Sequence, residues 1–144
     1  MNYLKIAFSV LIILSASRLI PHPPNFTTTI AVAFYLPALF GFKYTIITLT
    51  AFVASDLIIG THNLLFFTWG SVLIIGLVSQ LFKANLSLRI SGALFGACIF
   101  FLVTNFGVWI SGMYGYTFQG LLECYTLAIP FFAYTMISTL LFSL

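Results

Sequence analysis

The chain has 144 residues, of which 62% are apolar and 5% carry a charge. A soluble domain carries about 25% charged residues, so this composition excludes a soluble enzyme. Disordered chains and nucleic-acid binders also need more charge, and a net charge of +3 is too small to form a basic patch. The alternating pattern typical of a membrane barrel is absent. The composition therefore predicts an all-α integral membrane protein with a single transmembrane domain over residues 1–144.

Apolar segments separated by turn residues predict six transmembrane helices. The first run begins near Lys5 and imitates a signal peptide, but it continues through Leu19 and Ile20, so we expect a retained helix. Three prolines between residues 21 and 24 end it, because proline lacks a backbone donor and restricts its predecessor. Pro37 and Pro130 are expected to bend the second and sixth helices. The predicted helices cover residues 3–20, 27–42, 44–59, 64–82, 88–110 and 118–141.

The break between the second and third helices rests on length. One helix over residues 27–59 would be about 50 Å long, whereas the hydrocarbon core of a bilayer is about 30 Å thick. A tight turn at Gly41-Phe42-Lys43 resolves the excess. Both helices are then short, which suits a protein with a cavity or a locally thinned edge.

The distribution of basic residues predicts the orientation. With the N-terminus in the cytoplasm, the inner segments hold Lys5, Lys43, Lys83 and Arg89, while the outer segments hold only Arg18. This bias obeys the positive-inside rule, and merging the second and third helices would destroy it. We therefore expect a multi-pass protein of the bacterial cytoplasmic (inner) membrane with both termini in the cytoplasm.

The same topology gathers the remaining polar residues at the outer side. Asp56 and Glu123 lie within a turn or two of helix ends, where a charge is costly unless it is paired or hydrated. Arg18 and the histidines are the cations available to them. We expect an outward-facing pocket with aromatic walls and a few polar groups that binds a small molecule. Its candidate residues are Arg18, His22, Asn25, Asp56, His62, Asn63, Trp69, Asn105, Trp109, Tyr114, Tyr116, Gln119 and Glu123.

Several of these residues also have a structural interpretation. Arg18 could form a purely structural ion pair with Asp56 or Glu123, and His22 could only brace its loop. The small-residue face from Gly92 to Gly96 is typical of helix packing. An ordinary interfacial belt would account for the aromatic residues Trp69, Trp109, Tyr114 and Tyr116.

Catalytic and metal chemistry are not expected. The residues His22, His62, Asp56 and Glu123 could ligate a metal, but they lack ligand spacing. No Ser-His-Asp arrangement, HExxH motif or mid-helix histidine pair is present. The sequence therefore predicts neither an enzyme nor a bound cofactor.

Four segments resemble a family of small bacterial membrane proteins that is itself similar to the S-components of energy-coupling-factor (ECF) transporters. They are RLIPHPPNFT at residues 18–27, SDLIIGTH at 55–62, TNFGVW at 104–109, and GLLECY at 120–125 with AIPFF at 128–132. The resemblance implies an S-component-like bundle of six helices with cytoplasmic termini. It also implies that the outer loops and the outer ends of the later helices hold the substrate.

The function implied by this resemblance is the uptake of a vitamin, a precursor or a similar micronutrient. An S-component docks on a transmembrane coupling protein driven by ATPases, often through an AxxxA motif on its first helix. Here Ala7 is followed four residues later by Leu11, so another membrane subunit is an alternative partner. The expected partners are thus the lipid bilayer, a small-molecule substrate and such a subunit, and not nucleic acid. A second functional class also fits, namely an accessory subunit that stabilises a larger membrane complex.

Overall fold

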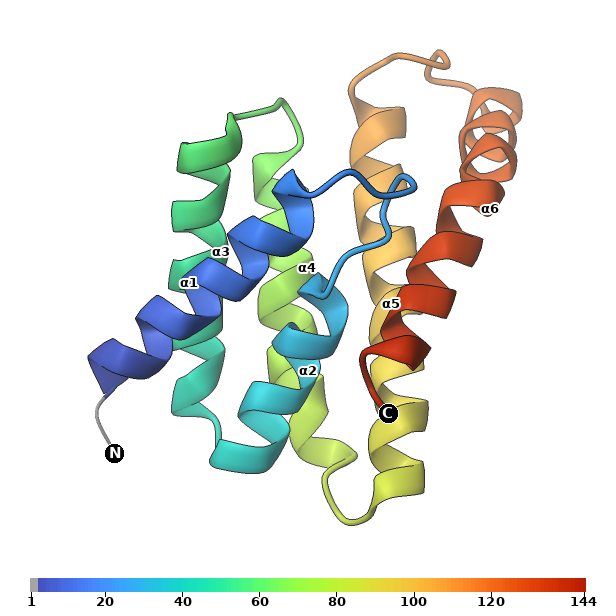
Figure 1. Cartoon of the computed structure of the whole chain (residues 1–144). Helices are drawn as coiled ribbons and strands as arrows, with labels where there is room; N and C mark the ends of the chain where they lie inside the picture. The colour runs from blue at the N-terminus through green and yellow to red at the C-terminus, as the bar shows by residue number, and fades with distance from the viewer. Residues whose placement is uncertain (1–2) are drawn as a thin grey trace.

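The computed structural model describes residues 3–144 and is an up-and-down bundle of helices (Figure 1). Within these residues there are six α-helices and one short 3-10 helix, and no strand. The predicted number and order of helices are therefore confirmed. Their bounds are α1 (Tyr3–Leu19), α2 (Thr29–Phe40), α3 (Lys43–Ile59), α4 (Leu65–Val78), η1 (Ser79–Leu81), α5 (Leu86–Ile110) and α6 (Phe118–Leu141).

The turn between α2 and α3 lies where the length argument placed it. Gly41 has a φ of 102°, a left-handed conformation that glycine adopts without steric cost. Its backbone N–H donates to the carbonyl of Pro37 at 2.9 Å, which closes the last turn of α2. Pro37 and Pro130 both lie inside helices that continue beyond them.

Side-chain caps set the starts of the last two helices. The Asn85 side chain accepts a hydrogen bond from the backbone N–H of Leu88 at 2.9 Å, so α5 begins at Leu86 instead of the predicted residue 88. The Thr117 hydroxyl accepts one from the N–H of Gly120 at 3.0 Å, and α6 begins at the predicted residue. The fourth helix is shorter than predicted, because its end tightens into η1.

Helix α2 occupies the centre of the bundle and packs against α3, α4 and α5. Helix α1 packs on α3, and α6 packs mainly on α5. The buried side chains of Leu14, Phe34 and Ile75 belong to the resulting core. A Cβ atom added at Gly92 would lie 2.5 Å from Cζ of Phe34, so only glycine fits there. The predicted packing role of the Gly92–Gly96 face is confirmed.

Two helices, α5 and α6, are long and apolar enough to cross a membrane. In their most apolar stretches only 22% and 28% of the residues are buried inside the bundle. A core helix of a soluble protein is mostly buried, whereas these helices expose large apolar side chains such as Leu102 and Ile137. Their composition and exposure indicate membrane association.

Candidate ligand-binding site

A partly enclosed cavity of about 450 Å³ lies toward the end of the bundle that carries the α1–α2 and α3–α4 connections. All six α-helices or their connections contribute side chains to its lining. Arg18 comes from the last turn of α1, and His22 and Asn25 come from the connection that follows. Asn25 has a φ of 62°, a left-handed conformation that asparagine tolerates in turns.

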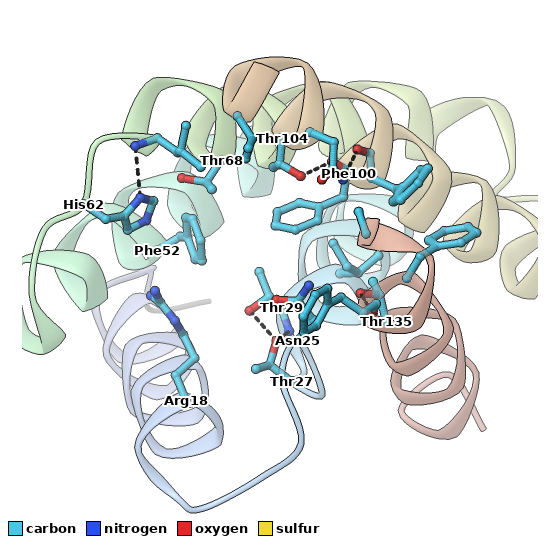
Figure 2. A pocket seen from close by; sticks show the side chains of 18 of the residues that line it. Arg18, Asn25, Thr27, Thr29, Phe52, His62, Thr68, Phe100, Thr104 and Thr135 are labelled. Atoms are coloured by element: carbon cyan, nitrogen blue, oxygen red, sulfur yellow. Dashed lines mark hydrogen bonds between the residues drawn. The ribbon is translucent and has the colours of Figure 1, made fainter. Parts of the chain in front are cut away.

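The cavity has two opposed walls (Figure 2). We call the side formed by Arg18, Phe52 and His62 the α1–α3–α4 wall, after the helices that carry or flank these residues. We call the opposite side, which includes Thr104, Asn105 and Thr135, the α5–α6 wall. Thr29, at the start of α2, and Thr68 of α4 lie between them.

A buried ion pair fixes the α1–α3–α4 wall. The guanidinium Nη2 of Arg18 lies 2.5 Å from Oδ1 of Asp56, whose side chain is completely buried. The indole N–H of Trp69 donates to Oδ2 of the same carboxylate at 2.7 Å. Nη1 of Arg18 donates to the Ser55 hydroxyl at 2.7 Å, and the guanidinium lies 4.9 Å from the centre of the Phe52 ring. One carboxylate therefore joins α1, α3 and α4.

The ion pair distinguishes the two acidic residues. The sequence left Asp56 and Glu123 as alternative partners of Arg18, and the structure shows the pair with Asp56. Glu123 lies on an exposed face of α6, and no ion pair involves it within residues 3–144. The expected partner for Glu123 is therefore absent from the described part of the chain.

The structure brings together only part of the predicted site. Arg18, His22, Asn25, His62 and Asn105 line the cavity. Asp56 and Trp69 do not line it, but they contact each other and hold Arg18 in place. The remaining predicted residues lie outside the lining, and these are Asn63, Trp109, Tyr114, Tyr116, Gln119 and Glu123.

The α5–α6 connection keeps several of these residues away from the cavity. The indole N–H of Trp109 donates to the carbonyl of Thr117 at 3.3 Å, so this ring is engaged by its own connection. Tyr116 is 73% exposed, and Gly112 packs against its ring. No residue of the α5–α6 connection is among those that line the cavity.

Sequence reasoning missed the threonines and phenylalanines of the lining. Thr104 and Thr135 each donate their hydroxyl to a carbonyl four residues earlier in their own helix, at 2.7 and 3.0 Å. Threonines that donate to a carbonyl of their own helix are common in apolar helices, so the sequence alone does not mark them as cavity residues. The chain has 17 phenylalanines, so the sequence does not distinguish those that line the cavity from the others. The others that were missed are Thr27, Thr29, Thr68, Phe52, Phe100, Phe101, Phe131 and Phe132.

Comparison with known proteins gives a family but no function. No curated protein and no solved structure matches the chain significantly. Within residues 3–144, no three His, Cys, Asp or Glu side chains are grouped so that they could hold a metal ion. A model of a family of unknown function, DUF6580, matches residues 2–144, and the chain therefore belongs to the DUF6580 family.

Proposed function

We propose that this protein is a substrate-binding membrane subunit for the uptake of a small micronutrient, which is held in the cavity beneath the outer connections. The observation that carries the proposal is the cavity itself. Its volume of about 450 Å³ falls within the range of small-molecule sites, roughly 300–1,000 Å³. Apolar and aromatic walls with a few polar groups are the usual composition of such sites.

The proposed topology has six membrane crossings with both termini in the cytoplasm of a bacterial cell. The up-and-down arrangement supports it, because the α2–α3 and α4–α5 connections lie at the end opposite the cavity (Figure 1). Lys43 and Lys83 belong to these connections or their edges, as the positive-inside rule requires of cytoplasmic segments. Helix α2 has 12 residues and spans only about 18 Å, but other helices surround it, so its ends need not reach lipid.

Cysteine labelling in intact cells tests this topology. In a background with Cys98→Ala and Cys124→Ala, a cysteine is placed at Met113 in the α5–α6 connection or at Ala84 in the α4–α5 connection. A membrane-impermeant maleimide is expected to label the Met113→Cys variant in intact cells. It should label the Ala84→Cys variant only after permeabilisation. Equal labelling of both variants, or the reverse pattern, would contradict the proposed crossings.

Ligand-induced stabilisation tests the binding function. The purified protein is heated with and without each member of a panel of vitamins and vitamin precursors, both charged and uncharged. A ligand at one hundred times its Kd stabilises the folded state by about 2.7 kcal/mol. Thr104→Phe, which fills the cavity, should abolish the response. Thr126→Phe, on an exposed face of α6 outside the lining, is the matched control and should retain it.

The accessory-subunit alternative makes the opposite prediction. In that case no member of the panel shifts the unfolding temperature, and a larger membrane complex co-purifies with the protein. The partly enclosed cavity favours the binding function, because a structural subunit has no need for one. The resemblance to S-components leads us to propose an ECF-type coupling protein with its ATPases as the partner. Co-purification with such a module would support this, while uptake by the isolated chain in vesicles would exclude a requirement for it.

A further inference from the structure

The charge inside the cavity is balanced before any ligand enters. Arg18 contributes a guanidinium, and Asp56 neutralises it from behind the wall. Both carboxylate oxygens of Asp56 are engaged, one by Arg18 and one by the Trp69 indole. No lysine, aspartate or glutamate is among the described residues that line the cavity. A charged ligand would therefore lack a counter-ion in surroundings that are largely apolar, which is costly.

The α1–α3–α4 wall offers hydrogen-bond donors. Nδ1 of His62 accepts the backbone N–H of Leu64 at 3.2 Å, so this nitrogen is not the one that carries the ring proton. The proton must then reside on Nε2, which becomes a donor. Arg18 has five N–H groups and no acceptor, and its bonds to Asp56 and Ser55 leave others free. This wall is suited to carbonyl oxygens or ring nitrogens of a ligand.

The α5–α6 wall offers acceptors. The hydroxyl protons of Thr104 and Thr135 are bonded to the carbonyls of Phe100 and Phe131, so only oxygen lone pairs face a ligand. The side-chain NH₂ of Asn105 donates one of its two N–H groups to the carbonyl of Phe101 at 2.7 Å, which leaves Oδ1 as an acceptor beside the second N–H. This wall is suited to amino or ring N–H groups of a ligand.

The aromatic lining favours a flat molecule. Phe52 lies beside Arg18 on one wall. On the other, the rings of Phe101 and Phe132 lie 4.5 Å apart between centres with an interplanar angle of 33°. Aromatic surfaces at both walls can contact the faces of a planar ring while the polar groups bind its edges. Figure 2 shows Arg18, Phe52 and His62 on one side of the cavity and Thr135 on the other.

We infer that the ligand is an uncharged, flat nitrogen heterocycle with an acceptor edge and an N–H donor edge. The acceptor edge binds Arg18 and His62, and the donor edge binds Thr104, Asn105 and Thr135. This inference rests on the proposed binding function and specifies the chemical class of its substrate.

Three matched probes test the class, with binding detected by saturation-transfer NMR on the purified protein. 4-Aminopyrimidine carries an amino group opposite a ring nitrogen, 4-(dimethylamino)pyrimidine has lost the N–H donors, and aniline has lost the ring acceptors. Adenine and cytosine extend the neutral set, while nicotinate and 1-methylnicotinamide represent anions and cations. We expect 4-aminopyrimidine, adenine and cytosine to bind and the other four probes to bind at least about threefold more weakly, since each lacks a hydrogen bond or carries a charge.

Variants locate the binding edges. Thr104→Val removes an acceptor at nearly constant shape and should weaken adenine binding about three- to tenfold, as expected for one lost hydrogen bond. Thr126 makes the same bond within its helix, to Leu122 at 2.7 Å, but lies outside the cavity, so Thr126→Val should leave adenine binding unchanged. His62→Leu should weaken it, and His62→Gln, which restores an N–H donor, should recover part of the loss.

The outcomes separate this inference from the function on which it rests. Preferential binding of nicotinate or 1-methylnicotinamide would overturn the uncharged class and leave the binding function intact. The same holds if only charged members of the micronutrient panel stabilise the protein. Failure of every probe and every panel member to bind a folded protein would overturn both. Equal loss in Thr104→Val and Thr126→Val would overturn the assignment of the donor edge.

Discussion

The two walls of the cavity are built in different ways. In the α1–α3–α4 wall, polar contacts cross between helices, because Asp56 forms an ion pair with Arg18 and accepts a hydrogen bond from Trp69. In the α5–α6 wall, the hydroxyls of Thr104 and Thr135 bond within their own helices. Between α5 and α6 the contacts are ring packing and hydrogen bonds to backbone carbonyls, from the Cys124 thiol to Asn105 at 3.4 Å and from the Tyr125 hydroxyl to Leu102 at 2.6 Å, with no ion pair between these two fully described helices.

This difference teaches which wall can adapt to a ligand. A buried ion pair with directional hydrogen bonds has one favourable geometry, so the α1–α3–α4 wall is rigid. Apolar packing is less directional and tolerates small shifts, so α6 can move on α5 at lower cost. We expect the rigid wall to orient the ligand and the packed wall to close on it. Four substitutions test this contrast.

The largest expected effect is that of Asp56→Ala. Removing the carboxylate leaves the Arg18 guanidinium, 18% exposed, without its partner, which costs about 3–5 kcal/mol for a buried pair. The unfolding temperature in detergent should fall sharply, and ligand binding should be lost with it. Glu123→Ala is the matched control on an exposed face of α6, and it should leave both unchanged. Similar effects for the two acids would remove the contrast between the walls.

Trp69→Phe is the next in size. It keeps an aromatic ring but removes the N–H that donates to Asp56 at 2.7 Å, and a hydrogen bond to a charged group contributes about 1.5–3 kcal/mol. Thermal unfolding should show this loss. Since Trp69 does not line the cavity, ligand affinity in the folded protein should change little. Trp109→Phe, with its bond to an exposed connection, should cost less and serves as the comparison.

Gly107→Ala tests the junction between the walls. A Cβ atom there would lie 2.5 Å from Cγ of Phe67 on α4, so α4 and α5 would have to separate, at a cost of about 1–3 kcal/mol. We expect lower thermal stability and weaker ligand binding, because the walls move apart. Gly70→Ala is the matched change on α4, where nothing lies within 4 Å of the new atom. It should be neutral or stabilising, because alanine favours a helix over glycine.

The extent to which the sequence predicts these features follows from their physical origin. The number of helices and the positions of their breaks depend on local signals that can be recognised in the sequence. Examples are the prolines after α1 and the turn at Gly41, without which residues 27–59 would form a helix too long for a bilayer. The scarcity of charge leaves Asp56 and Glu123 as the acidic partners available to Arg18, and the structure shows the pair with Asp56. Which face of each helix points into the bundle is not predictable in the same way. Helices α5 and α6 are apolar on nearly every face, so no polar or apolar stripe marks the buried side. Thr135 was missed and Glu123 misplaced for that reason.

The smallest expected effect is that of Tyr125→Phe, which probes the packed wall alone. The Tyr125 hydroxyl donates to the carbonyl of Leu102 at 2.6 Å, a directional bond between α6 and α5. Losing one hydrogen bond between neutral groups costs about 0.5–1.5 kcal/mol, so the unfolding temperature should fall by only a few degrees. If α6 closes on the ligand, releasing this bond should also change the dissociation rate of a bound ligand more than its association rate.

Phe8→Leu, an apolar change on the exposed face of α1, is the control for general loss of stability. A drop in stability as large as that of Trp69→Phe would mean that the α5–α6 wall is held as rigidly as its opposite.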